Sequence, residues 1–344
     1  MFIMISKVQS IKDKILRELK SGVYPADRPL PSRHQYMRRF KCSRMTVDRA
    51  IGELVESGFL ESRRGSGTYP ASSGSRDGGL TQVVLIGGFE DRGLAAEACR
   101  IATTIQDHIP CNMYNLSDAA VHLQRFTKPG TAVLWQRPTY AELLLMDNLK
   151  NSGIRQILIG RRYGDYDYVT TDAKSSIREG LKWLTESGDK RVCCVFEDFN
   201  PDFQYIGERH LAFYELALEM KLELSHESIC KVPRLTGLKL IPYIEKAADK
   251  IFEDGTRKQI FLCYQAAIEP FLAAAIRRGK EPGKDFTMLT FDYESRIADT
   301  PGVAMLRQRW KKLEQTAFEW VFMAKSSERF TKEIPAELVA PEDK

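Results

Sequence analysis

The sequence predicts two folds in one chain: a winged helix-turn-helix domain of the α+β class, followed by a larger α/β domain with two lobes. The charge distribution is the first reason. Residues 1–70 contain 14 Lys and Arg against 7 Asp and Glu, a net charge of +7, whereas the rest of the 344-residue chain has a net charge of −2. The second reason is that this basic part contains three short helical patterns and a hairpin, and the third is that strands and helices alternate after residue 80.

The best-marked element is a short helix predicted over 44–57. Ser43 precedes it, and a serine hydroxyl in this position accepts a hydrogen bond from an amide of the first turn, here that of Met45 or Thr46. Apolar residues recur at helical spacing and predict one buried stripe, made of Val47, Ala50, Ile51 and Leu54. The other side is predicted to stay exposed and carries Arg44, Met45, Asp48 and Arg49. The helix therefore presents hydrogen-bond donors at its outer end.

Three further elements complete the first domain. The spacing of apolar residues predicts helices over 5–20 and 32–40, and alternation with glycine turns predicts a hairpin over 59–69. Arg63 and Arg64 fall at the tip of this hairpin, the wing. A basic excess confined to such a domain indicates a polyanionic partner, double-stranded DNA.

Short motifs in this domain match a known family. They are Leu30-Pro-Ser32, Ser43-Arg-x-Thr-Val47, Ala50-Ile-x-x-Leu54, Gly58-Phe-Leu60 and Arg64-Gly-x-Gly-Thr68. With them, residues 5–69 resemble the GntR family of bacterial transcription regulators. The resemblance, together with the exposed helix end and the wing, predicts a set of operator-contacting residues: Ser32, Arg33, Ser43, Arg44, Met45, Thr46, Arg49, Arg64 and Gly65.

Two positions depart from that family. The family commonly has Glu-Arg after Pro-Ser, where this chain has Arg33-His34. It commonly has Arg-Glu after Thr-Val, where this chain has Asp48-Arg49. Because base-reading residues sit at these positions, we expect an operator sequence different from those of better-known relatives.

The second domain begins after a linker. Residues 71–79 have no apolar residue that would anchor them, so we expect domains at 1–70 and 80–344 with a flexible linker between them. Beyond the linker, strands are predicted at 83–86, 111–116, 131–135, 156–160, 168–171, 192–196, 260–263 and 286–291. Helices are predicted at 93–107, 140–152, 174–187, 204–220, 238–252 and 266–278. This alternation indicates a doubly wound parallel sheet, and the length of the domain favours two lobes.

A second resemblance covers residues 80–340. Its markers are Val169-Thr-Thr-Asp172, Arg209-x-x-x-Phe213, Leu289-Thr-Phe-Asp292 and Leu306-Arg-Gln308, which resemble the periplasmic-binding-protein-like effector domain of the LacI/GalR family. A GntR-type DNA-binding domain, here residues 1–70 and called the head below, joined to such an effector domain is the arrangement of the arabinose repressors of Bacillus-like bacteria. The resemblance implies a cytoplasmic, homodimeric repressor of carbohydrate genes that responds to a small-molecule effector, a sugar. In one departure, the family has Asn-Asp where this chain has Tyr264-Gln265.

Ligands of open parallel sheets bind beside the carboxyl ends of strands. The candidate effector contacts near such ends are Phe89, Trp135, Arg161, Asp172, Arg209, Tyr264 and Asp292. Aromatic faces stack on sugar rings, and Arg and Asp bond hydroxyl groups, so the set suits a carbohydrate. Structural roles stay open, since an Asp after a strand often caps the next helix and Trp135 could pack between lobes.

The sequence also bears on other functions. A nucleoside ligand, or a domain that only dimerises, stays an alternative because of Tyr264-Gln265. Phosphate-loop, dinucleotide and H-E-x-x-H motifs are absent, and no nucleophile with an orienting partner is found, so we expect no enzyme activity, cofactor or metal. Seven scattered cysteines, with no signal peptide and no long apolar run, favour a reducing cytoplasm and no membrane.

Overall fold

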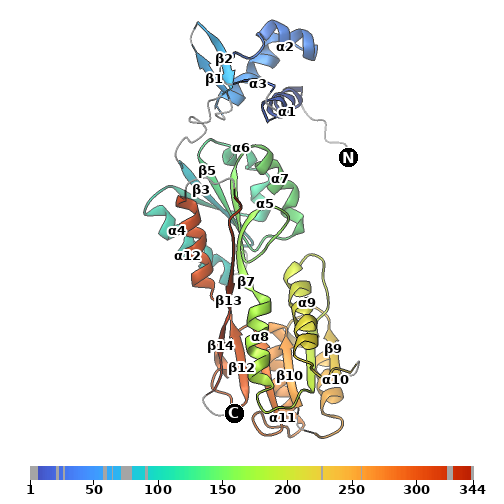
Figure 1. Ribbon diagram of the computed structural model, residues 1–344. Helices are drawn as coiled ribbons and strands as arrows, with labels where there is room; N and C mark the ends of the chain where they lie inside the picture. The colour runs from blue at the N-terminus through green and yellow to red at the C-terminus, as the bar shows by residue number, and fades with distance from the viewer. Residues whose placement is uncertain are drawn as a thin grey trace. The chain divides into compact units, whose positions relative to one another are not determined.

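A computed structural model describes residues 7–20, 23–25, 28–56, 60–63, 65–70, 80–89, 92–225, 228–256, 258–323 and 328–341 (Figure 1). The chain divides into two compact units. One consists of residues 1–136, 142–157 and 318–324, and the other of residues 137–141, 158–317 and 325–344. The predicted linker at 71–79 lies outside the described residues, so the predicted domain boundaries remain predictions.

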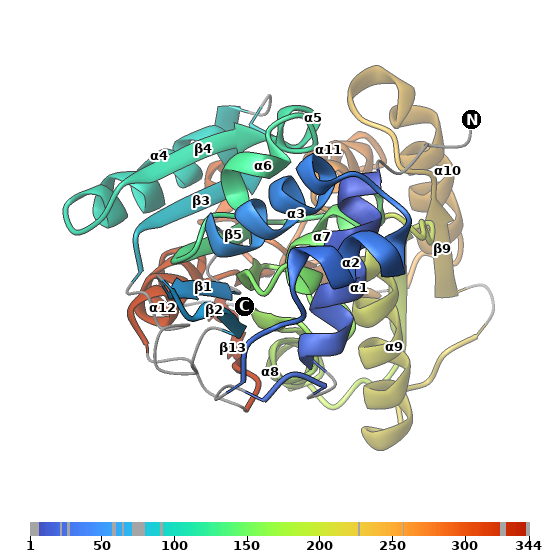
Figure 2. The same cartoon turned by 90° about the horizontal axis from the view of Figure 1, so that it is seen from above.

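The first unit opens with three helices and a hairpin (Figure 2). The helices are α1 (Lys7–Lys20), α2 (Arg33–Phe40) and α3 (Arg44–Glu56), and the antiparallel strands are β1 (Leu60–Arg63) and β2 (Gly67–Pro70). Apolar side chains of all three helices share one core, made of Ile11, Ile15, Leu30, Tyr36, Val47, Ala50, Ile51, Leu54 and Leu60. The predicted stripe of α3 is entirely within this core, which confirms the winged helix-turn-helix.

Side-chain caps set where α2 and α3 begin. Ser32 caps α2 through its hydroxyl, which accepts from the Gln35 amide, while the Gln35 side chain accepts from the Ser32 amide. Lys41 ends α2 in the left-handed region, at φ 46°. The Ser43 hydroxyl then accepts from the Thr46 amide at 3.3 Å, as predicted. These local hydrogen bonds fix the turn that positions α3.

One six-stranded sheet has the strand order β13-β7-β6-β5-β3-β4. Its strands are β3 (Gln82–Gly87), β4 (Cys111–Asn115), β5 (Thr131–Gln136), β6 (Arg155–Ile159), β7 (Asp167–Asp172) and β13 (Thr331–Pro335). Between them run α4 (Arg92–Gln106), α5 (Leu116–Ala119), α6 (Leu123–Phe126) and α7 (Leu143–Asn151), the last preceded by a 3-10 turn (Tyr140–Glu142). Strand β3 pairs in parallel with both β4 and β5.

A second six-stranded sheet has the order β14-β12-β11-β10-β8-β9. Its strands are β8 (Val192–Glu197), β9 (Ile229–Val232), β10 (Lys258–Cys263), β11 (Phe286–Phe291), β12 (Val303–Arg307) and β14 (Glu337–Val339). The helices are α8 (Ala173–Leu184), α9 (Gln204–Glu219), α10 (Ile241–Phe252) and α11 (Ile268–Arg277), with 3-10 turns at Gly237–Lys239, Gln265–Ala267 and Ser295–Ile297. Helix α12 (Trp310–Phe322) belongs with the first sheet: it runs beside α4, and the Trp320 carbonyl accepts from Arg155 of β6 at 3.1 Å (Figure 1). Among the described helices, none is long and apolar enough to cross a membrane.

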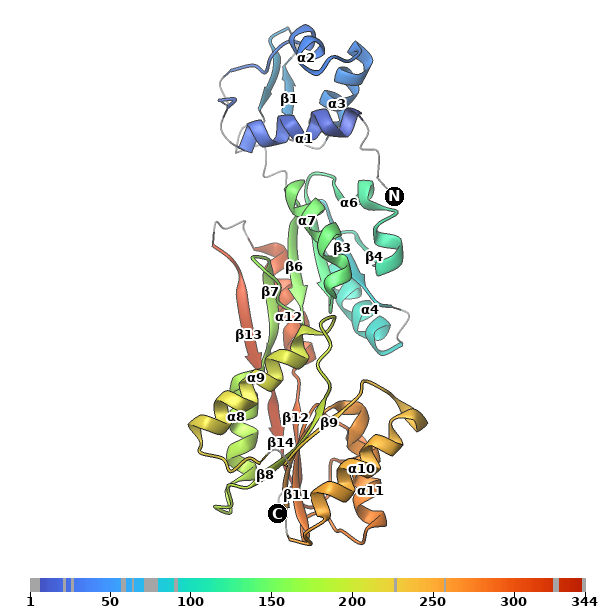
Figure 3. The same ribbon diagram turned by 90° about the vertical axis from the view of Figure 1, so that its right-hand side faces the viewer.

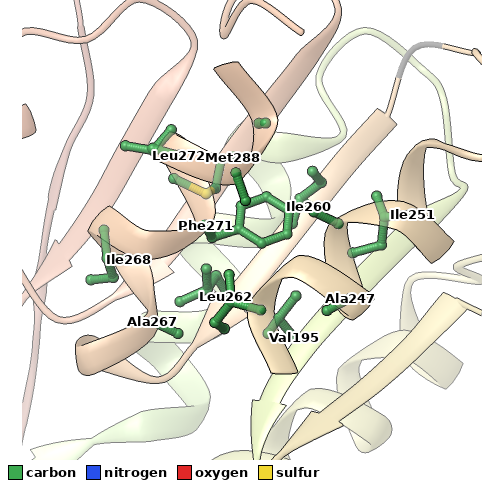
Figure 4. Close-up of a cluster of buried hydrophobic side chains, with 14 of the residues drawn as sticks. Val195, Ala247, Ile251, Ile260, Leu262, Ala267, Ile268, Phe271, Leu272 and Met288 are labelled. Atoms are coloured by element: carbon green, nitrogen blue, oxygen red, sulfur yellow. The ribbon is translucent and has the colours of Figure 1, made fainter. Parts of the chain in front are cut away.

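The second sheet is buried on both faces because helices cover both of them. Successive side chains of a strand point to opposite faces, so each strand packs against both layers of helices. Val195, Ile260 and Leu262 pack against α10 and α11 around Phe271 (Figure 4). Their neighbours along the strands, such as Cys194 and Phe261, pack against α8 and α9. Figure 3 shows the two helix pairs on opposite sides of the sheet. The apolar runs of β8, β10 and β11 thus confirm a doubly wound arrangement.

The carboxyl-terminal segment supplies a strand to each sheet. Strand β13 pairs in parallel with β7, and β14 pairs antiparallel with β12. Between them, the Ala336 amide donates to the Ser176 hydroxyl of α8 at 2.8 Å. Neither strand was predicted, because both are short and mostly exposed or half-buried and show no apolar alternation. The prediction also missed β9, β12 and α12.

We expect Phe271→Ala to lower the free energy of unfolding of the α/β domain by ~3–5 kcal/mol. The ring is fully buried at the centre of the apolar cluster between the second sheet, α10 and α11, so its loss leaves a cavity. All four tryptophans lie in the α/β domain, so denaturant unfolding followed by tryptophan fluorescence reports on it alone. Ile276→Ala on the same helix is the control, with a change within ~0.5 kcal/mol because Ile276 is exposed. Equal losses in the two variants would contradict the packing described.

Candidate functional site

Helix α3 exposes two guanidinium groups at its outer surface. The side chains of Arg44 and Arg49 are 71% and 74% exposed. Each pairs with a carboxylate one turn along the helix, Arg44 Nε with Asp48 Oδ2 at 3.4 Å and Arg49 Nε with Glu53 Oε1 at 3.1 Å. Exposed pairs of this kind contribute little to stability. Both guanidinium groups can therefore leave their carboxylates for a stronger anionic partner.

Arg33 connects the three parts of the head. Its Nη1 donates to the Thr68 hydroxyl of β2 at 2.7 Å, and its Nε lies 3.4 Å from Asp48 Oδ1 on α3. Asp48 thus receives both Arg33 and Arg44. At the two positions where the sequence departs from the GntR pattern, the structure places an ion pair that ties α2, α3 and the wing together.

The wing is held by an aromatic contact. The Arg63 guanidinium lies 4.3 Å from the centroid of the Tyr69 ring, and the Tyr69 hydroxyl is 2.6 Å from that of Ser66. Gly65, at φ 76°, adopts the left-handed conformation that the turn requires and is exposed. Arg64 lies outside the described residues, so its predicted role is untested.

Of the remaining DNA-contact candidates, both on α3, Met45 is 83% exposed, whereas Thr46 is half-buried beside Ser43.

In the second unit, Asp292 organises a buried polar network. Its carboxylate accepts from Arg209 Nη1 at 3.0 Å and from the Gln308 side chain, whose oxygen accepts from the Thr171 hydroxyl at 2.8 Å. Asp292 follows β11 with φ 88°, a value that non-glycine residues rarely adopt. Backbone strain of this kind is often stored at functional sites.

Three arginines contact Tyr205, which lies in the first turn of α9. We call Arg161, Arg209 and Arg234 the arginine cluster. The guanidinium carbons of Arg161 and Arg209 lie 4.4 Å and 4.9 Å from the centroid of the Tyr205 ring. Arg234 Nη1 donates to the Tyr205 hydroxyl at 3.0 Å and pairs with Glu197 at the end of β8. The cluster combines an aromatic face with charged donors and acceptors, the chemistry that recognises a polar ring.

Burial and neighbouring charges shift the pKa values of several groups around Tyr205. Burial raises the pKa of Glu197, although Arg234 opposes the shift. Burial lowers the pKa of Arg161 to about 10; Tyr205 and Tyr163 oppose the shift, and the charges of Arg137 and Arg209 add to it. For Arg209, burial would lower the pKa, but Asp292 raises it overall. Arg161 and Arg209 therefore stay charged at neutral pH.

His210 lies beside Arg209 on α9 and is neutral. Its ring is 4.5 Å from that of Phe196, and its Nε2 is buried without a hydrogen-bond partner among the described residues. Burial lowers its pKa to about 4, with the charges of Lys231 and Arg209 acting in the same direction. A neutral imidazole fits a site that already holds several positive charges.

The other effector candidates take structural positions. Asp172 caps α8, accepting from the Ser175 amide at 2.9 Å. Tyr264 is 6% exposed and donates its hydroxyl to the Leu235 carbonyl. In the first unit, Trp135 is fully buried and bonds Gln156 at 2.9 Å, and the Phe89 ring covers Gly87. The structure thus groups Arg161, Arg209 and Asp292 but gives Trp135 no exposed surface for a ligand.

Sequence reasoning missed four members of this network. Glu197 directly follows the strand predicted at 192–196 and so meets the same criterion as the chosen candidates. Tyr205 precedes Arg209 by one helical turn. Gln308 is part of the Leu306-Arg-Gln308 motif, for which the sequence predicts no ligand contact. Arg234 follows β9, a strand that was not predicted. Among the described residues, no group of three or more His, Cys, Asp or Glu is arranged to hold a metal ion.

Comparison with known proteins agrees with the fold of the head. Residues 7–69 match the bacterial regulatory proteins of the gntR family. GmuR of Bacillus subtilis, an HTH-type transcriptional regulator, is 36% identical over 73 residues, 21% of this chain and 31% of GmuR. This chain thus spans about a third of that relative.

Two relatives are named for sugar metabolism. The probable fructoselysine utilization operon transcriptional repressor of Shigella flexneri is 29% identical over 241 residues, 66% of this chain and 91% of that protein. The arabinose metabolism transcriptional repressor of Geobacillus stearothermophilus is 37% identical over 65 residues, 19% of this chain and 18% of that protein. The second match is too short to extend beyond one domain of that repressor.

The α/β domain has the fold of LacI-type regulators. The solved structure of a LacI-family regulatory protein from Chloroflexus aggregans covers 74% of this chain and 96% of its own, with a TM-score of 0.59 and 14% identity. At this identity the similarity establishes the fold alone. The predicted fold class, a gntR-type head joined to a LacI-type α/β domain, is confirmed.

We expect His210→Phe to weaken the pH dependence of stability. With a pKa of about 4 folded and about 6.5 unfolded, His210 binds its proton more tightly in the unfolded state, so stability is lost as pH falls from about 6.5 towards 4. We expect a loss on the order of 1 kcal/mol between about pH 7 and pH 5, absent in the variant. Urea unfolding followed by tryptophan fluorescence measures it. The wild type, measured at the same pH values, is the reference, and an equal loss in His210→Phe would contradict the assignment to His210.

Proposed function

We propose that this chain is an effector-controlled bacterial transcription regulator, a repressor of carbohydrate genes that acts as a homodimer in the cytoplasm. The observation that carries the proposal is the combination, in one chain, of a gntR-type head and the Arg209–Asp292 pair beside Tyr205. The names of the Shigella and Geobacillus relatives, which refer to fructoselysine and arabinose, support a sugar-derived effector.

The DNA contacts follow from the head. Recognition helices of this type enter the major groove by their amino-terminal end, and each head of a dimer reads one half-site. Arg44, Met45 and Arg49 are exposed there, with Ser43 and Thr46 at the start of the helix. Ser32 and Arg33 open α2, and Gly65 and Arg64 complete the contact set on the wing. Arg33 would act mainly by orienting α3, because its guanidinium already bonds Thr68 and Asp48.

Effector control requires differential binding. A ligand that prefers the arrangement unable to bind operator weakens DNA binding by its own difference in affinity between the two arrangements. We propose that Arg209, Asp292 and Arg161 make the main ligand contacts. Trp135 is left out of this set because it is buried, and Asp172 because it caps α8.

One alternative retains the head and changes the role of the other domain, which would bind a nucleoside or only dimerise. The observation in its favour is that Tyr264 is buried and its hydroxyl is already bonded to Leu235. Thermal-shift screening of the full chain with matched sugar and nucleoside panels separates the readings. Stabilisation by nucleosides alone supports a nucleoside-binding domain. No stabilisation by either panel supports a domain that only dimerises.

Arg49→Ala should relax base choice. If its guanidinium makes a bidentate contact to guanine, the variant loses ~1–3 kcal/mol on the operator and little on scrambled DNA. Gel-shift titrations with a duplex recovered by in vitro selection measure both affinities. Arg64→Ala on the wing is the comparison, because loss of a phosphate contact weakens all duplexes alike. Equal losses on both duplexes for Arg49→Ala would remove the base-reading role.

Asp292→Asn should abolish the effector response while leaving operator affinity nearly unchanged, the phenotype of a super-repressor. The change removes the charge that pairs with Arg209 and weakens any hydroxyl contact, at a cost of ~1–3 kcal/mol in effector binding. Operator release is measured against the compound that emerges from the thermal-shift screen. The control is Asp189→Asn, whose carboxylate pairs with Arg191 just before β8. Normal release by Asp292→Asn would place the effector elsewhere.

A further inference from the structure

Arg161 differs from the other members of the arginine cluster in its partners. Arg209 pairs with Asp292, and Arg234 pairs with Glu197. Among the residues that the structure describes, Arg161 has no carboxylate within ion-pair distance. Its Nη1 donates to the Gly160 carbonyl at 2.6 Å, and its Nε is buried without any hydrogen-bond partner in the described chain. One guanidinium of the cluster is therefore charged and only partly satisfied.

The surroundings of Arg161 do not compensate that charge. Burial lowers the pKa of Arg161, Tyr205 and Tyr163 oppose the shift, and the positive charges of Arg137 and Arg209 add to it; no carboxylate is among these neighbours. The contact with the Tyr205 ring offers an aromatic face but no anion. A buried charge is costly unless it is paired and hydrogen-bonded. The fold keeps this cost although an uncharged residue in the same place would avoid it.

The position of Arg161 suggests what would remove the cost. Arg161 and Arg209 lie over the same Tyr205 ring, and Arg209 is bound to Asp292. A small molecule that contacts the Arg209–Asp292 pair through its hydroxyl groups would lie within reach of Arg161. The planar guanidinium matches the oxygens of a phosphate or a carboxylate, with which it forms short, charge-assisted hydrogen bonds.

We propose that the effector is anionic, a sugar derivative carrying a phosphate or carboxylate group that binds Arg161. This inference rests on the proposed function, because it assigns the ligand class of that same site. A neutral sugar would leave Arg161 unpaired, so the site selects against it by the cost of that buried charge.

The test uses small oxyanions on the full chain, so it does not depend on knowing the effector. Melting temperatures are measured by tryptophan fluorescence in chloride, inorganic phosphate and formate at constant ionic strength. Because all four tryptophans lie beyond residue 80, phosphate bound by the head does not enter this signal directly. We expect at least one oxyanion at tens of millimolar to raise the melting temperature of the wild type by about 2 °C or more over chloride.

Variants assign the effect to Arg161. Arg161→Gln should lose the oxyanion shift, and Arg161→Lys should keep part of it, because the ammonium retains the charge without the planar fork. Arg191→Gln, an exposed arginine before β8 that is paired with Asp189, should behave like the wild type. In chloride alone, Arg161→Gln should melt no lower than the wild type, because it removes an unpaired charge.

Each outcome decides one point. A shift with phosphate only identifies a phosphoryl group, and a shift with formate only identifies a carboxylate. Equal shifts in the wild type and Arg161→Gln, or none in the wild type, overturn the inference. A clear loss of melting temperature for Arg161→Gln in chloride also overturns it, since Arg161 would then be structural. Operator binding by the same preparations tests the regulator proposal separately, so an intact gel shift without an oxyanion shift defeats only the anionic effector.

Discussion

The ion pair between Arg209 and Asp292 is the interaction on which the candidate effector site depends. Both side chains are largely buried, so truncating one of them would leave the other charge unpaired, whereas Asp292→Asn keeps an oxygen that can accept from Arg209. The pair joins α9 to the end of β11, and Gln308 extends it to Thr171 on β7. The strained backbone of Asp292 is tolerated because its amide and carbonyl are also bonded, to Leu306 and Thr290.

Charge has a different use in the head. There the arginines of α3 are exposed, and their pairs with Asp48 and Glu53 are weak enough to exchange for phosphate or base edges. Arg33 is the exception, since it is held between Thr68 and Asp48. One chain thus contains both extremes of arginine chemistry: exposed groups that are free to change partner, and buried groups whose partners determine the local structure.

The sequence predicted what periodicity controls. The buried stripe of α3, the cap at Ser43 and the central strands of both sheets follow from spacing and composition, and the structure has them. Position after a strand selected Arg161 and Asp292, and the structure places both around Tyr205 and Arg209. It could not tell that Trp135 points into the core, because a strand end does not reveal which face its last side chains occupy. Tyr205 and Arg234 were missed because long-range stacking leaves no local pattern.

The pairing of β14 with β12 has a consequence for aggregation through sheet edges. Strand β14 covers the outer side of β12, a strand whose residues Val303, Ala304, Met305 and Leu306 are all completely buried. Without the three residues of β14, β12 would become an open edge of apolar sequence with unpaired amides and carbonyls. Such an edge is the kind of template on which amyloid-like pairing begins. β14 itself is short and begins with Glu337, which pairs with Arg307, so the edge that the sheet finally presents is brief and charged. The last strand therefore works as a built-in guard against aggregation.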